Sequence, residues 1–171
     1  MKKLILVLML LCIFIFCFAE AETVFANGAS AVPKASEVKT DNRAYILRQF
    51  FAKYNSQLDA SANDFVAAAD FYGFDWRMLA AISGIESTFG KQMIKGTYNA
   101  YGWGGGTIYF KSWSDGIWTI SKAIKEKYAD RGADTIYKIG RIYCPPNPQW
   151  SYKVESFMNK IEATSSLTPN L

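Results

Sequence analysis

Hydrophobic side chains recur at helical spacing along most of the chain from residue 41 onward. In residues 41–54, Ile46, Phe50 and Tyr54 lie about one turn apart and give one apolar face to a helix. Similar stripes predict further helices over residues 61–73, 76–89, 115–128, 133–143 and from about 149 to 163. The pattern therefore predicts a mainly α fold, with one domain of about six short helices over residues 42–163.

Polar residues and glycines mark the predicted helix ends. Ser61 and Ser112 are each followed three residues later by an aspartate, which is the form of a capping box. Gly73 ends the second helix, because glycine readily adopts the left-handed conformation that follows a helix. Residues 98–110 contain four glycines and no helical stripe, so they predict a small lobe of loop, with at most a strand pair around residues 107–110.

The first 21 residues have the pattern of a secretory signal peptide. Two lysines precede an uncharged apolar run over residues 4–18, and residues 19–21 (Ala-Glu-Ala) place small side chains at a cleavage site. Because a membrane span needs about 20 apolar residues, we expect a secreted or cell-surface protein without stable membrane insertion; an uncleaved anchor is the alternative. Residues 22–41 predict a flexible leader, and residues 164–171 predict a disordered tail.

Composition narrows the possible chemistry. The 171 residues include no histidine, which excludes Ser–His–Asp and Cys–His nucleophile systems and histidine-ligated zinc. Carboxylates are left as the natural acid–base groups. The 19 lysines and arginines outnumber the 15 acids but form no dense patch, so nucleic-acid binding is not indicated. Cys144 is the one cysteine left after cleavage and is predicted to be inert; we expect a monomer without metal or cofactor.

Glu86 is the carboxylate best placed for catalysis. It borders the apolar stripe of the third predicted helix and lies in its last turn, where the helix dipole opposes a negative charge. Apolar neighbours also oppose ionisation, so both effects favour the protonated acid. A carboxylic acid kept protonated near neutral pH can donate a proton to a glycosidic oxygen. The alternative is an ordinary surface glutamate at a helix edge.

Two short motifs around Glu86 resemble a known family. The string AISGIESTFGK (residues 81–91), followed by NAYG (residues 99–102), is similar to the E-S-x-[WF]-G-K and N-x-[FWY]-G motifs of bacterial glucosaminidases, the mannosyl-glycoprotein endo-β-N-acetylglucosaminidase-like enzymes. Lytic transglycosylases share only the E-S core. The resemblance covers about residues 65–160, and it implies a lysozyme-like fold, the peptidoglycan glycan strand as substrate and Glu86 as general acid.

The sequence departs from the family pattern where a second acid is expected. Gln92 replaces the usual serine, and the three glycines at residues 104–106 are not part of the pattern. Residues 92–114 contain no Asp or Glu, and Asp115, the next acid, fits better in the Ser112 capping box. The motif therefore favours hydrolysis by a glucosaminidase, whereas the missing acid favours a lytic transglycosylase or a substrate-assisted route.

Seven aromatic residues within residues 98–118 predict a sugar-binding groove, since sugars pack their CH faces against aromatic rings. Tyr101 and Trp103, which lie among the glycines, are predicted to contact the substrate, and Asn99 to bind its hydroxyls. The segment around Tyr143 resembles a late segment of the same families, which implies that Tyr143 closes the groove near the acid; a core or helix-end role is the alternative.

The sequence thus supports one main hypothesis and two alternatives. The main hypothesis is a secreted enzyme that cuts the peptidoglycan glycan strand with Glu86 as proton donor, as a glucosaminidase or, next, as a lytic transglycosylase. The alternatives are a wall-binding module that keeps the groove without turnover, and a structural or adhesion domain that binds no peptidoglycan.

Overall fold

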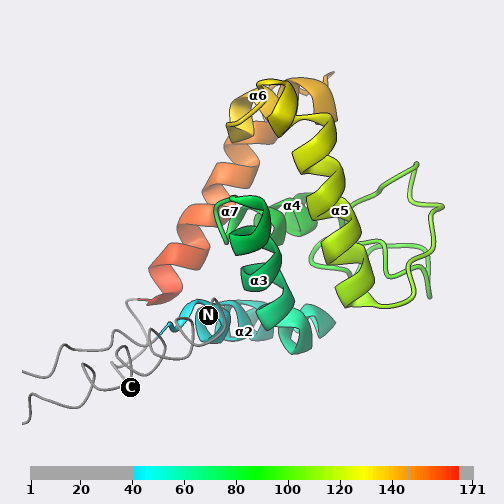
Figure 1. Cartoon of the computed structure of the whole chain (residues 1–171). Coiled ribbons are helices and arrows are strands. Elements are labelled where there is room, and N and C mark those ends of the chain that lie inside the picture. Colours follow the sequence, from blue (N-terminus) through cyan, green and yellow to red (C-terminus); the bar gives the residue numbers. More distant parts are fainter. Residues whose placement is uncertain (1–40, 146, 166–171) are drawn as a thin grey trace, which may run out of the picture. The chain divides into compact units, whose positions relative to one another are not determined.

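A computed structural model of the chain describes residues 41–145 and 147–165, and it confirms the mainly α class (Figure 1). These residues form six α-helices and two 3₁₀ helices and contain no strand. In chain order the elements are α2 (Arg43–Lys53), η1 (Gln57–Ser61), α3 (Ala62–Tyr72), α4 (Met78–Ser87), α5 (Trp113–Lys127), η2 (Ala129–Arg131), α6 (Ile136–Tyr143) and α7 (Trp150–Ser165). The predicted signal peptide, nearly all of the leader and most of the tail lie outside the described residues.

The helix α4 is at the centre of this domain. Its first six residues are all buried, namely Met78, Leu79, Ala80, Ala81, Ile82 and Ser83. It packs mainly against α7, while α3 packs against both α2 and α5. Figure 1 shows α4 behind α3 and between α7 and α5. A helix that is covered on several sides must be apolar around most of its circumference, which explains its sequence.

An aromatic cluster fixes the C-terminal end of α4. Thr88 and Phe89 adopt left-handed φ angles of 51° and 59°, which end the helix and turn the Phe89 ring back beneath it. Gly84 leaves room for this ring, because a Cβ there would lie 2.6 Å from it. The rings of Phe50 and Phe157 lie 5.4 and 5.1 Å from the Phe89 ring, so α2, α4 and α7 meet at this point.

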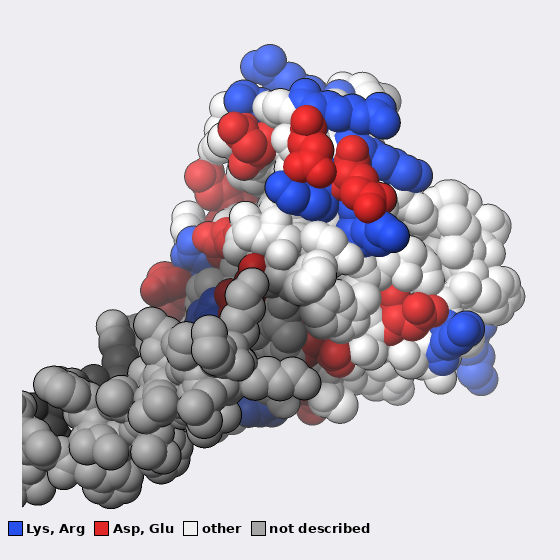
Figure 2. Space-filling model, viewed as in Figure 1, with Lys and Arg blue, Asp and Glu red and all other residues white. Residues whose placement is uncertain are grey.

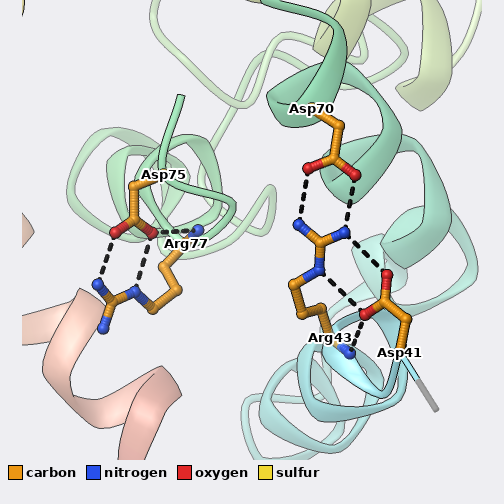
Figure 3. Close-up of polar contacts among 5 residues, drawn as sticks. All are labelled: Asp41, Arg43, Asp70, Asp75 and Arg77. Carbon is orange, nitrogen blue, oxygen red and sulfur yellow. Dashed lines mark hydrogen bonds and ion pairs between the residues drawn. The ribbon is translucent and has the colours of Figure 1, made fainter. Parts of the chain in front are cut away.

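Two arginines near helix N-termini form ion pairs with nearby aspartates (Figure 3). The Arg43 guanidinium donates to Asp41 at 2.8 Å and to Asp70 at 2.7 Å, and thereby joins the start of α2 to α3. The Arg77 guanidinium donates to Asp75 in the turn before α4 at 2.9 Å. Because these side chains are partly exposed, the ion pairs fix geometry more than they add stability.

The serine half of the predicted capping box forms at Ser112, whereas Ser61 makes no capping bond. Ser112 Oγ accepts a hydrogen bond from the Asp115 backbone N–H at 3.1 Å. Ser61 precedes α3, but its side chain makes no capping bond. The reason is that Ser61 is also the last residue of η1 and has φ −99° and ψ 13°, instead of the extended backbone that directs a capping side chain at the N–H groups of the first helical turn.

The lobe between α4 and α5 is loop throughout, as predicted, and the strand pair that the sequence allowed at most around residues 107–110 does not form. The Phe110 N–H donates to the Thr97 carbonyl at 2.8 Å, but no ladder of bonds extends this contact. Gly102 and the glycines at residues 104–106 all have left-handed φ angles between 62° and 82°. A chain that curls at four glycines does not present the extended edge that strand pairing requires.

Charge is distributed unevenly over the surface (Figure 2). Over α5 and α6, basic side chains are interspersed with acidic ones, as in the ion pairs Lys125–Asp130 at 2.9 Å and Lys138–Asp134 at 2.8 Å. The lobe is nearly white in this view, in keeping with a single charged residue within residues 92–110. Within the described part of the chain, no helix is long and apolar enough to cross a membrane.

Candidate active site

Glu86 lies in the last turn of α4, half-buried, and its two carboxylate oxygens have different surroundings. Oε1 accepts a hydrogen bond from the Trp150 indole Nε1–H of α7 at 2.7 Å. Oε2 lies beside Gly102 of the lobe, where a Cβ would be 3.4 Å from it. The carboxyl group therefore bridges the helical body and the loop lobe, with one oxygen held and the other next to bare backbone.

Burial of the carboxyl group raises the pKa of Glu86 above its ordinary value, and the hydrogen bond from Trp150 offsets part of this rise. The direction agrees with the sequence-based expectation that Glu86 favours its protonated form. The cause includes a neighbour that the sequence did not indicate, because nothing in the pattern around Trp150 suggests a carboxylate partner.

A groove of about 460 Å³ opens at Glu86. Its lining residues come from the end of α4 and from the lobe: Glu86, Ser87, Gln92, Met93, Ile94, Asn99, Gly102, Gly105 and Gly106. Among these lining residues Glu86 is the one ionisable group. The groove therefore combines a protonatable carboxyl group with neutral polar side chains, two apolar side chains and glycine backbone.

Ser87, the residue after Glu86, attaches the lobe to α4. Its hydroxyl donates to the Ala100 carbonyl at 2.8 Å and accepts a hydrogen bond from the Gly90 N–H at 2.8 Å. Ser87 is 2% exposed, so both bonds are shielded from water. The serine of the E-S pair thus holds the loop against the helix, immediately beside the carboxyl group.

The structure corrects the role predicted for Asn99. Its side chain is 1% exposed, and its amide Nδ2 donates to the carbonyls of Trp103 at 2.8 Å and Ile108 at 3.1 Å. Its Oδ1 accepts a hydrogen bond from the Trp103 N–H at 3.0 Å. The amide that was predicted to bind sugar hydroxyls is therefore used to fold the glycine loop, although Asn99 still forms part of the groove floor.

Tyr101 is also corrected, because its ring belongs to the core rather than to the groove. The residue is 2% exposed, and its hydroxyl is buried without a hydrogen-bond partner among the described residues. Its backbone carbonyl accepts a hydrogen bond from the Tyr143 hydroxyl at 2.6 Å. Tyr101 resembles an exposed ligand contact in sequence because glycines follow it, but its side chain is buried in the hydrophobic core.

In addition to the Tyr143–Tyr101 hydrogen bond, the rings of Trp103 and Tyr143 form an aromatic contact between the lobe and α6. Their ring centroids are 5.9 Å apart, and the Lys127 ammonium lies 5.8 Å from the Trp103 ring. Trp103 is half-buried and does not line the groove at Glu86, so its predicted contact with substrate stays a prediction. Tyr143 also stacks on Trp150, with centroids 5.0 Å apart and an interplanar angle of 24°.

The Tyr143 hydroxyl makes its hydrogen bond to the lobe and not to Glu86. The hydroxyl is directed to the Tyr101 carbonyl, and the ring reaches the acid only through Trp150. Burial, followed by the negative charge of Glu86, raises the pKa of the Tyr143 phenol. Tyr143 does not line the groove, so its predicted role in closing the groove near the acid stays a prediction.

Asp115 takes the structural role that its sequence position favoured. Its Oδ2 accepts a hydrogen bond from the Lys111 N–H at 2.9 Å, and its own N–H is capped by Ser112. It does not line the groove. The described part of the groove thus provides one carboxylate, and the second acid that a glucosaminidase pattern suggests is not supplied by Asp115.

No protein-family model and no curated protein matches this chain. The resemblance to bacterial glucosaminidases therefore rests on the two motifs around Glu86 and on what the site can do chemically.

Proposed function

We propose that this protein is a glycosidase that cuts the β-1,4 glycan strand of peptidoglycan, of the endo-β-N-acetylglucosaminidase type, with Glu86 as general acid. One observation carries the proposal. Glu86 is half-buried with a raised pKa, one of its oxygens is held by Trp150, and it opens onto a groove of about 460 Å³. A raised pKa favours the protonated form of a carboxyl group, and a proton donor beside such a groove is what acid-catalysed glycosidic cleavage requires.

The chemistry follows from the state of Glu86. Its proton moves to the glycosidic oxygen, the bond between that oxygen and C1 breaks, and positive charge develops on C1 and the ring oxygen. The carboxylate left on Glu86 is negative and close to this charge, so it stabilises the transition state electrostatically. Water then adds to C1, either with help from the carboxylate or after attack by the substrate's own acetamido group.

The groove suits a neutral polymer backbone. Gly105 and Gly106 line it without side chains, which lets a sugar ring approach the main chain closely. Met93 and Ile94 provide apolar surface for the CH face of a sugar. Since Glu86 is the one ionisable lining residue, the recognition surface carries no second charge that would select a small ionic ligand.

Lytic transglycosylation is the second candidate, and the single carboxylate of the groove favours it. In that reaction the C6 hydroxyl of the muramyl residue attacks C1 as the glycosidic bond breaks, and its proton is transferred to the Glu86 carboxylate. One group then serves as acid and afterwards as base, so no partner acid is needed. The motif favours hydrolysis and the lone acid favours the transglycosylase; only the products distinguish them.

The test is mass spectrometry of peptidoglycan digested with the purified protein. Hydrolysis leaves reducing N-acetylglucosamine ends, and transglycosylation leaves 1,6-anhydromuramyl ends. The Glu86→Gln variant is expected to release neither product, while the matched Glu126→Gln variant, which changes an exposed glutamate paired with Lys122, is expected to release the wild-type product at the wild-type rate. If wild type binds the wall but releases nothing, the protein is a binding module and the proposal is wrong.

A further inference from the structure

The Glu86 carboxyl group lies inside a closed series of contacts. Trp150 donates to Oε1 at 2.7 Å, and Tyr143 stacks on the Trp150 indole. The Tyr143 hydroxyl donates to the Tyr101 carbonyl at 2.6 Å. The next residue, Gly102, lies beside Oε2. The Glu86 carboxyl group of α4 is thus contacted by Trp150 of α7 and lies beside Gly102 of the lobe, and α6 connects these two neighbours through Tyr143.

The contact with the indole restricts where a proton can be carried. An indole N–H donates a hydrogen bond and accepts none, so Oε1 must act as the acceptor in both protonation states. In a protonated carboxyl group the carbonyl oxygen is the better acceptor. The proton is therefore favoured on Oε2, which is the oxygen beside Gly102.

We propose that Trp150 is a positioning residue that places the proton of Glu86 on Oε2, toward the groove. The proposal rests on the proposed role of Glu86 as general acid, because only an acid needs its proton aimed at a substrate. It goes further in assigning the delivering oxygen and the residue that selects it.

The Trp150 indole is held firmly enough to do this. The residue is 1% exposed, and one of its ring faces is covered by Tyr143. The helix α6 approaches Trp150 at Gly140, where a Cβ would lie 2.9 Å from the Trp150 Cε3 atom. A glycine at this crossing lets α6 approach α7 closely enough to press Tyr143 onto the indole. The direction of the N–H is therefore set by packing on two sides.

An indole is also suited to orient an acid without ionising it. A lysine or arginine in the same place would lower the pKa of Glu86 strongly through its charge. The indole is a neutral donor that does not titrate, so it fixes the geometry while burial keeps the pKa raised. Tyr143 of α6 is a titratable group close enough to Glu86 to respond to its charge. Burial and then this charge raise the pKa of the Tyr143 phenol, so the phenol stays neutral over the pH range in which Glu86 titrates.

The decisive experiment compares two substitutions that each remove an indole. Trp150→Phe removes the hydrogen-bond donor to Glu86. Trp118→Phe removes the donor to Asp64, a hydrogen bond of 3.3 Å between residues that do not line the groove. In each variant the Glu86 carboxyl carbon is followed by NMR titration, and steady-state cleavage of soluble glycan strands is measured across pH.

For Trp150→Phe we expect the pKa of Glu86 to rise further, because the bond that stabilises the carboxylate is gone. The fall in kcat at high pH then moves to a higher pH. At the optimum kcat is expected to drop about tenfold to a hundredfold, with KM little changed, because the acid is misplaced while the groove is intact. Trp118→Phe is expected to keep the wild-type pKa, pH profile and kcat.

Trp150 is buried, so Trp150→Phe can also weaken the fold. A 3-benzothienylalanine at position 150 keeps the bicyclic shape and loses only the N–H, and it is expected to give the same pKa rise and kcat loss in a stably folded protein. An unchanged pKa of Glu86 in Trp150→Phe or in the 3-benzothienylalanine variant, or a change in KM alone in these two variants, would overturn the proposal. The titration needs no turnover, so this failure is distinguishable from failure of the proposed function, which Glu86→Gln tests.

Discussion

Two carboxylates of this protein accept a hydrogen bond from an indole, and their surroundings differ. Asp64 Oδ1 accepts from Ser114 at 2.8 Å and from Trp118 at 3.3 Å, so it joins α3 to α5. Glu86 Oε1 accepts from Trp150, while Oε2 lies beside Gly102 and the groove. The same kind of contact therefore connects two helices at Asp64, whereas at Glu86 it leaves the second oxygen beside the groove, where we propose that it delivers a proton.

The largest expected difference between the two carboxylates is in cleavage. Removing a general acid costs about 10² to 10⁴ in rate, so with the proposed role of Glu86 we expect Glu86→Gln to lose activity by that factor. Asp64→Ala leaves Ser114 and Trp118 without their acceptor, and is expected to lose about 1 to 2 kcal/mol of stability while keeping its activity per folded molecule. Cleavage assays and denaturant unfolding measure both; equal activity losses would remove the distinction.

A smaller effect is expected from crowding the free oxygen of Glu86. In Gly102→Ala the new Cβ would lie 3.4 Å from Oε2, at a φ of 62°, and we expect about a tenfold loss of kcat from displacement of the acid. Gly73→Ala is the matched control, since its φ is 74° and no atom lies within 4 Å of the new Cβ.

Both glycine variants carry a similar left-handed strain of about 1 kcal/mol. They should therefore show similar losses in denaturant unfolding but different kcat values. A wild-type kcat in Gly102→Ala would mean that Oε2 does not take part in proton delivery.

The raised pKa of Glu86 predicts a modest dependence of stability on pH. The folded state binds this proton more tightly than the unfolded state does, so the resulting stability is complete below the unfolded-state pKa and is lost as pH rises through the folded-state pKa. Glu86→Gln, which cannot ionise, is therefore expected to melt a few degrees higher than wild type at neutral pH, with the difference shrinking as pH falls toward about 4.

Thermal unfolding across pH measures this difference, and Glu126→Gln reports the effect of removing a negative charge from an exposed position. A difference between wild type and Glu86→Gln that does not vary with pH would contradict the raised pKa.

The smallest effect is expected at the helix that carries Trp118. Ser112→Ala removes the N-cap bond of α5 and is expected to cost about 1 kcal/mol in denaturant unfolding, with cleavage unchanged. Ser61→Ala should cost less, because the Ser61 side chain makes no capping bond. Equal losses would show that the cap contributes nothing beyond local packing.

Local signals were sufficient to predict most of the fold. The 3.6-residue periodicity predicts all six described α-helices to within a few residues, and the Ser112 motif predicts a cap that the structure confirms. The Ser61 motif has the same form but is overridden by η1, a short 3₁₀ helix whose sequence has too few residues to show a period. The strand pair that the sequence allowed at residues 107–110 does not form, because the preceding glycines adopt left-handed φ angles and bend the chain.

In the candidate site, too, local sequence predicted some residues correctly and others incorrectly. The position of Glu86 at the end of an apolar helix was evident from sequence, and so was the better use of Asp115 as a cap. Asn99 and Tyr101 were predicted to face substrate, but the structure buries both. Short polar and glycine-rich segments look the same whether their side chains bind a ligand or fold the loop itself, and only the position of the rest of the chain resolves the difference.

The sequence by itself determined the acid, its helix and the glycine-rich lobe beside it, because each depends on residues close together in the chain. Only the tertiary structure decided which groups surround the acid. Trp150 lies 64 positions after Glu86 and reaches it because α7 packs along α4, with Gly140 permitting the close approach of α6. Contacts at such separation depend on how helices pack, and a local hydrophobic period carries no information about which partner a buried side chain meets.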